Sequence, residues 1–162
     1  MAEAPPCDLD RYFYFKDVKQ HDWLFRHVWE GLTGDKPARD AKAEHLATLR
    51  DRGVYLIDIH EDNISNPKRT DLSPNVRGLI ERCRTLAPEH VVLIKSIVYD
   101  VAYVPLVEAG FEVIDERMPF PASGQQRRFL ESFRRAAAKA GFAKERPRVK
   151  RVHGAAARQG LP

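Results

Sequence analysis

Two short apolar runs of the sequence end in an ionisable residue that could take part in chemistry. Asp58 lies at the end of the run Val54–Ile59, and Lys95 ends the run His90–Lys95. Apolar runs of this length are typical of buried parallel strands, and ligands of parallel sheets bind at the carboxyl ends of the strands. The Asp58 carboxylate could accept hydrogen bonds from a base edge or bind a cation, and the Lys95 ammonium could neutralise a phosphate.

Each of these residues also has a purely structural interpretation. Asp58 could cap the loop that follows it, and Lys95 could extend along apolar surface from the end of its strand. Asp58, His60 and Asp62 alternate along the chain and could bind a metal weakly, although such a run more often forms a polar loop. Two cysteines, Cys7 and Cys83, cannot form a disulfide framework or a four-thiolate cluster. We therefore expect no metal and no cofactor.

The segment 118–126 is the most distinctive part of the chain. Two prolines flank its aromatic residue and restrict its conformations, and a helix is expected to begin just after Ser123. Arg127 and Arg128 would lie in the first helical turn, where a positive charge opposes the helix dipole unless an anion is bound. We therefore expect Ser123, Gln125, Arg127 and Arg128 to bind a DNA phosphate, the alternative being an ordinary capped helix start.

Periodicity predicts helices alternating with strands. Apolar spacing predicts helices within 17–34, 37–52, 76–86, 97–109 and 125–140, and buried strands at 54–59, 90–95 and 111–114. This order is typical of a three-layer α/β/α fold with a short parallel sheet. We expect one domain over residues 1–141, followed by a basic, disordered tail over 142–162.

Charge is distributed unevenly along the 162 residues, whose net charge is +4. The stretch from Arg127 to Arg158 holds eleven Lys and Arg and two Glu, a net of +9, so the rest of the chain carries −5. Such a basic stretch favours nucleic acid as a partner, although a solvated helix and tail would look the same. The sequence shows no apolar run long enough to span a membrane and no signal peptide, so we expect a cytoplasmic monomer.

Three segments, taken in order, resemble motifs of the uracil-DNA glycosylase superfamily. Residues 2–6 (A-E-A-P-P) resemble its G-E-A-P-G motif, 53–58 (G-V-Y-L-I-D) resemble G-V-L-L-L-N, and 118–123 (M-P-F-P-A-S) resemble H-P-S-P-L-S. The resemblance implies the α/β/α fold and base flipping followed by hydrolysis of the N-glycosidic bond. It also implies that Glu3 positions the attacking water and that Phe13 stacks on the extruded base.

Departures from the motifs change what the resemblance implies. Asp58 stands where the family has the asparagine that reads the base edge, Met118 replaces the histidine that stabilises the departing base, and Ala122 replaces the inserted leucine. The family's first strand precedes its first motif, and here that strand is missing from the expected fold. We predict a divergent DNA glycosylase that acts on a modified or deaminated base, with Phe13, Asp58 and Met118 contacting it. The alternatives are a non-catalytic nucleic-acid-binding module and a small-molecule hydrolase that uses Asp58 and His60.

Overall fold

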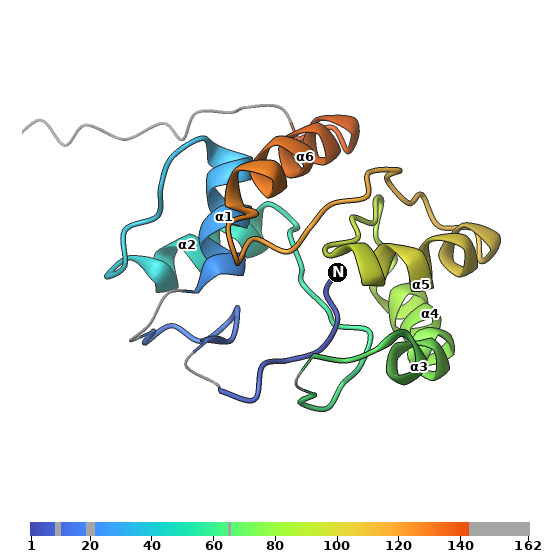
Figure 1. Cartoon of the computed structure of the whole chain (residues 1–162). Coiled ribbons are helices and arrows are strands. Elements are labelled where there is room, and N and C mark those ends of the chain that lie inside the picture. Colours follow the sequence, from blue (N-terminus) through green and yellow to red (C-terminus); the bar gives the residue numbers. More distant parts are fainter. Residues whose placement is uncertain (9–10, 19–21, 65, 143–162) are drawn as a thin grey trace, which may run out of the picture.

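The structure, a computed structural model, describes residues 1–8, 11–18, 22–64 and 66–142 (Figure 1). Its helices are α1 (Trp23–Thr33), α2 (Lys42–Asp51), α3 (Arg69–Leu72), the 3₁₀ helix η2 (Ser73–Asn75), α4 (Val76–Leu86), α5 (Ser96–Glu108) and α6 (Gln126–Lys139). The predicted helices are therefore present, with shifted boundaries. The predicted tail, apart from Phe142, lies outside the described residues.

Local interactions set where helix α1 begins and ends. The carboxylate of Asp22 accepts a hydrogen bond from the backbone N–H of Phe25 at 3.2 Å, which satisfies a donor that the first turn leaves free. Gly34 ends the helix in the left-handed region, with a φ of 88° that a side chain would disfavour. The helix thus starts at Trp23, well after the position where its apolar periodicity first appears.

Two hydrophobic clusters form the interior, and extended segments run between them (Figure 1). The first cluster is built mainly from α1, α2 and α6, and the second from α3, α4 and α5. Side chains of the extended segments alternate between the two clusters, as extended backbone requires. The first cluster receives Val54, Leu56, Val92 and Ile94, and the second receives Ile57, Ile59, Val91 and Leu93.

The predicted parallel sheet is not formed, so the expectation of a three-layer α/β/α fold is wrong. In place of strands, the described residues show two isolated parallel bridges, Ala2 with Asp58 and Val91 with Val113. On one edge of the run Val54–Ile59, the Tyr14 hydroxyl bonds to the N–H and the carbonyl of Leu56, so these groups pair with a side chain and not with a neighbouring strand. The apolar runs correctly indicated burial on two sides, but burial does not specify backbone pairing.

Residues 1–3 nevertheless hold two distant segments in place. The backbone of Ala2 donates to the carbonyl of Ile57 at 2.9 Å and accepts from the N–H of Ile59 at 3.0 Å. On its other side, Met1 donates to the carbonyl of Val92 at 2.8 Å and accepts from the N–H of Ile94 at 2.8 Å. These bonds bring Glu3 close to the chain before α5. Among the described helices, none combines the length and apolar character needed to cross a bilayer.

Candidate functional site

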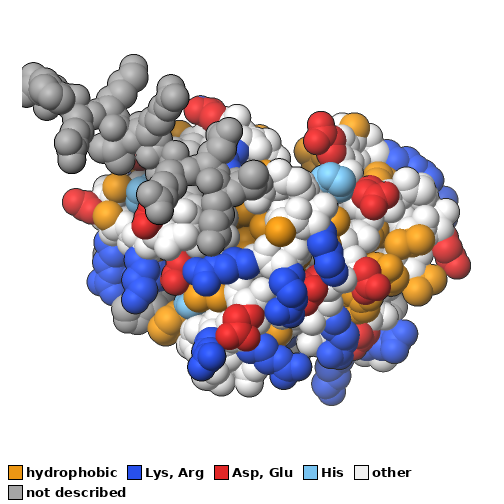
Figure 2. Space-filling model, turned by 90° about the horizontal axis from the view of Figure 1, so that it is seen from above, with side chains coloured by type: hydrophobic (Ala, Val, Ile, Leu, Met, Phe, Trp, Pro, Cys, Tyr) orange, Lys and Arg blue, Asp and Glu red, His pale blue; other side chains and the backbone are white. Residues whose placement is uncertain are grey.

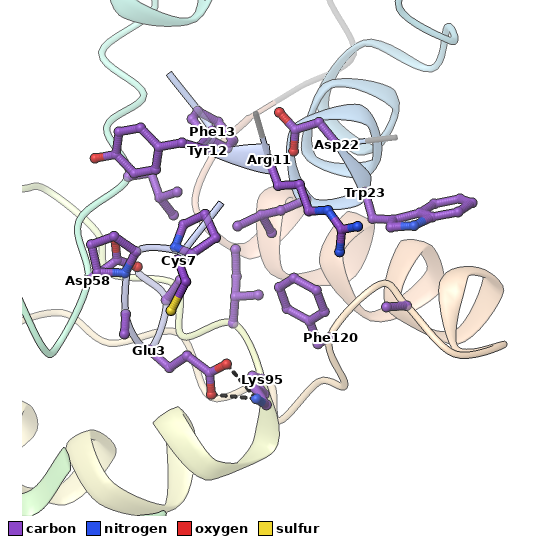
Figure 3. A pocket seen from close by; sticks show the side chains of 18 of the residues that line it. Glu3, Cys7, Arg11, Tyr12, Phe13, Asp22, Trp23, Asp58, Lys95 and Phe120 are labelled. Carbon is purple, nitrogen blue, oxygen red and sulfur yellow. Dashed lines mark hydrogen bonds and ion pairs between the residues drawn. The ribbon is translucent and has the colours of Figure 1, made fainter. Parts of the chain in front are cut away.

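A cleft of about 480 Å³ opens beside Glu3, and we call it the Glu3 cleft. Four of the predicted site residues line it: Glu3, Phe13, Asp58 and Lys95 (Figure 3). They come from segments far apart in the sequence, which the backbone bonds of residues 1–3 bring together. A volume in the range of about 300–1,000 Å³ is typical of small-molecule sites, so the cleft has room for a nucleoside-sized ligand.

An ion pair between Glu3 and Lys95 lies at the wall of the cleft (Figure 3). Lys95 Nζ donates to Glu3 Oε1 at 2.5 Å and also to Oε2. Lys95 immediately precedes α5 and has a φ of 81°, a conformation that few side-chain-bearing residues adopt. The Glu3 side chain is 19% exposed, so this pair both fixes and neutralises a carboxylate that little water reaches.

Asp58 supplies a second carboxylate on the same cleft. Burial, assisted by the negative charge of Glu3, raises the pKa of Asp58 from its ordinary 3.8 to about 6. The positive charges of the Met1 amine and of Arg82 act in the opposite direction. Arg82 donates to the backbone oxygens of Asp58 and Ile59, and the part of the chain that the structure describes shows no hydrogen bond to the Asp58 carboxylate. Asp58 can therefore exchange a proton near neutral pH.

Aromatic side chains form part of the remaining wall. Phe13 is 4% exposed and packs edge-on against Tyr14 and Phe25, with ring centroids 5.1 and 5.6 Å away. Its ring is thus largely engaged by the protein interior. Phe120 and Tyr12 are half-buried and both line the cleft, so they are better placed than Phe13 to present a ring face to a planar ligand.

Met118, a predicted base contact, lies elsewhere. Its side chain is fully buried in the first hydrophobic cluster and does not line the Glu3 cleft. Phe120, two residues further along the same proline-flanked loop, lines the cleft instead. The two prolines made this loop recognisable in the sequence. The sequence alone did not indicate which side chain of the loop faces the cleft.

The predicted phosphate-binding residues are not brought together with Lys95. Ser123, which has a φ of 52°, and Gln125 precede α6 without lining the cleft, and the Gln125 side chain makes no capping bond. Arg127 pairs with Glu131 at 3.0 Å and its side chain is 93% exposed, while Arg128 is exposed beside it. Figure 2 shows Lys and Arg side chains interspersed with Asp and Glu on the face in view, not gathered into one patch.

Asp58, His60 and Asp62, the possible metal ligands, do not form a metal site among the described residues. His60 Nδ1 accepts a hydrogen bond from the backbone N–H of Asp62 at 3.1 Å. Within the described ranges, no three His, Cys, Asp or Glu side chains come together in a way that could hold a metal ion. The cysteine Cys7 is exposed at the cleft and Cys83 is buried.

No protein-family model, curated protein or solved structure matches this chain. The chemistry that the Glu3 cleft can perform depends on the groups that line it. These groups include an ion-paired carboxylate, a carboxyl group with a pKa of about 6, and aromatic rings.

Proposed function

We propose that the Glu3 cleft binds a nucleobase of DNA and hydrolyses the N-glycosidic bond that joins the base to its sugar. The observation that carries the proposal is the pair of carboxyl groups, Glu3 and Asp58, on a cleft whose other walls include Tyr12 and Phe120. Two carboxyl groups in different environments are what acid-assisted hydrolysis of a glycosidic bond requires. Aromatic walls suit a planar base that has left the helical stack.

The roles of the two carboxyl groups follow from their surroundings. Asp58, with its pKa of about 6, would donate a hydrogen bond or a proton to the base. The electron pair of the breaking C–N bond passes to the base nitrogen, and a water oxygen forms the new bond to the sugar carbon. Glu3, held by Lys95, would orient that water, accept its proton and stabilise the positive charge on the sugar.

A second candidate function is binding of a base without hydrolysis. It is favoured by one specific observation: Lys95 Nζ contacts both carboxylate oxygens of Glu3. A carboxylate that is neutralised in this way is a weaker proton acceptor than a free one. Catalysis would then require the ligand to loosen this ion pair, whereas binding would not.

Single-turnover base release distinguishes the two candidates. The substrates are single- and double-stranded oligonucleotides that contain uracil, hypoxanthine or xanthine, with the matching free nucleosides as a separate set. We expect release by the wild-type chain, a loss of about 10²–10⁴-fold in Glu3→Gln, and a smaller loss in Asp58→Asn. Glu108→Gln, an exposed change at the end of α5 and outside the cleft, is the matched control and is expected to retain full activity.

Each result has a definite meaning. Equal release by the wild type and by Glu3→Gln would contradict the proposed mechanism. Binding of the oligonucleotides without release, measured by fluorescence anisotropy, would support the binding function. Release from nucleosides but not from oligonucleotides would identify a small-molecule hydrolase and exclude DNA as the substrate. Thermal denaturation of each variant establishes that a loss of activity is not a loss of folding.

A further inference from the structure

A slot lies between two extended segments, residues 53–57 and 88–92. It begins next to Met1, on the side away from Glu3. Cavities of about 170 and 140 Å³ open into it. The two cavities share five lining residues of these segments, with Gly53 and Tyr55 on one side and Pro88, His90 and Val92 on the other. Met1 also lines both cavities, so its position marks one end of the slot.

The two cavities lie towards different helices. The larger one is bounded by Val28 of α1 and by Phe133 and Ala137 of α6, which belong to the first hydrophobic cluster. The smaller one is bounded by Cys83 and Leu86 of α4, on the side of the second cluster. The slot therefore has apolar space on both of its faces.

The backbone groups that border the slot continue the pattern set by residues 1–3. Parallel pairing repeats every second residue. Because Ala2 bonds to the peptide groups of Ile57 and Ile59, the next groups on that side are the carbonyl of Tyr55 and the N–H of Ile57. Met1 bonds to the carbonyl of Val92 and the N–H of Ile94 on the other side. Two residues earlier along that segment, the next groups are the carbonyl of His90 and the N–H of Val92.

These four backbone groups have no hydrogen-bond partner within the described parts of the chain. Water can reach them through the slot, because Tyr55 and His90 are exposed and Ile57 and Val92 are half-buried. They form two donor–acceptor pairs that face each other across the slot. Only another extended backbone carries donors and acceptors on both of its edges at this spacing, so the groups are complementary to a polypeptide and not to a lipid or a sugar.

We propose that the slot binds an extended polypeptide segment, parallel to residues 53–57 and 88–92, with its carboxyl end next to Met1. Its peptide groups bond to Tyr55 and Ile57 on one edge and to His90 and Val92 on the other. Successive side chains point to opposite faces, so they enter the two cavities in turn. Since both cavities are apolar, the segment carries apolar residues at consecutive positions, and the small cavity volumes favour valine-sized side chains.

Hydrogen exchange with a defined peptide tests the proposal. The probe is the acetylated and amidated peptide Lys-Thr-Val-Val-Val-Val-Thr-Lys, and the control is the same peptide methylated on its two central valine nitrogens. At a concentration about ten times its Kd, the probe is expected to slow exchange of the Ile57 and Val92 amides about tenfold. The methylated control, which cannot donate to Tyr55 or His90, is expected to leave both rates unchanged.

A pair of surface variants provides an independent readout. Leu86 is 46% exposed and lines the smaller cavity, whereas Val107 is 45% exposed on α5 and lies outside both cavities. Leu86→Lys is expected to weaken peptide binding at least tenfold and Val107→Lys to leave it unchanged. The proposal is overturned if the probe slows neither amide, if the methylated peptide protects them equally, or if the two variants bind the probe alike.

Discussion

The hydroxyl of Tyr14 closes a double hydrogen bond on the peptide groups of Leu56, 42 residues away in the chain. It donates to the Leu56 carbonyl at 3.0 Å and accepts from the Leu56 N–H at 2.6 Å. One side chain thus does what a neighbouring strand would do for that peptide. It also ties the aromatic segment 12–15, which contributes Tyr12 and Phe13 to the Glu3 cleft, to the segment that ends in Asp58.

Replacing Tyr14 with phenylalanine is expected to lower the free energy of unfolding by about 1 kcal/mol, because two backbone groups lose their partner. The loss stays near this value because Tyr14 is 37% exposed and water can partly replace the hydroxyl. Urea denaturation measures the change. Tyr55→Phe is the control, since the Tyr55 side chain is 63% exposed and makes no hydrogen bond in the described structure. Equal effects of the two substitutions would refute the structural role of Tyr14.

Gly31 is expected to resist substitution because α1 and α6 approach each other there. A Cβ atom at Gly31 would collide with ring atom Cδ1 of Phe133 on α6. Alanine favours a helix over glycine by about 1 kcal/mol, but overpacking in a tight core costs about 1–3 kcal/mol, so Gly31→Ala should destabilise the chain on balance.

Gly78 on α4 provides the matched control for Gly31. The nearest atom to a Cβ there is Arg82 Nη1 at 3.7 Å, an ordinary contact with a flexible side chain. Gly78→Ala should therefore raise stability by about 0.5–1 kcal/mol through helix propensity alone. Thermal or urea denaturation of both variants gives the two signs. Stabilisation by Gly31→Ala would show that the α1–α6 contact is looser than the structure indicates.

The sequence predicted the helices better than the connections between extended segments. Apolar residues at helical spacing, such as those of α4 and α6, report a local property that is independent of distant partners. Pairing of the run Val54–Ile59 depends instead on which chain lies beside it. The distant partners of this run include Ala2 and the Tyr14 hydroxyl, neither of which a local pattern identifies.

In the candidate site, too, local features could be predicted from the sequence and contacts between distant residues could not. Asp58 and Lys95 were identified because polar residues at the ends of apolar runs stand out in the sequence. The ion pair between Lys95 and Glu3 joins residues 92 positions apart, and no spacing rule predicts it. Within the proline-flanked loop, composition could not decide between Met118 and Phe120, because the choice depends on packing against α1 and α6.

His45 makes stability depend on pH. Its Nε2 atom is buried and has no hydrogen-bond partner among the described residues, and the centroid of its ring lies 4.0 Å from that of the Trp29 ring. Burial lowers the pKa of His45 below its ordinary 6.5, against the opposing influence of the Glu44 and Asp40 charges. The folded state therefore prefers the neutral ring, and the stability that this preference contributes is lost as the pH falls below 6.5.

His45→Phe keeps an aromatic ring against Trp29 and removes the titratable group. We expect the wild-type chain to lose more stability than His45→Phe between pH 7 and pH 5, as measured by thermal denaturation at each pH. His90→Gln is the control, because His90 is exposed and its change should not alter the pH dependence. Parallel pH profiles for wild type and His45→Phe would argue against a buried neutral ring.

Asp58 is expected to make the folded state less stable at neutral pH than a matched amide would. The pKa of Asp58 rises from 3.8 to about 6 on folding, so the folded state binds its proton more tightly than the unfolded state does. The stability gained from that proton is complete below pH 3.8 and is lost as the pH rises through about 6. Above pH 6, an ionised Asp58 therefore destabilises the fold by about 1–3 kcal/mol.

Asp58→Asn should accordingly stabilise the chain by about 1–3 kcal/mol at pH 8 and have little effect at pH 4. Urea denaturation across this range measures both values. Asp62→Asn, an exposed change in the loop that follows, is the control and should show no such pH dependence. A gain at pH 8 together with loss of base release would identify Asp58 as a carboxyl group retained for its chemistry at a cost in stability. An equal effect of Asp58→Asn at pH 4 and pH 8 would mean that its carboxyl group does not titrate in this range.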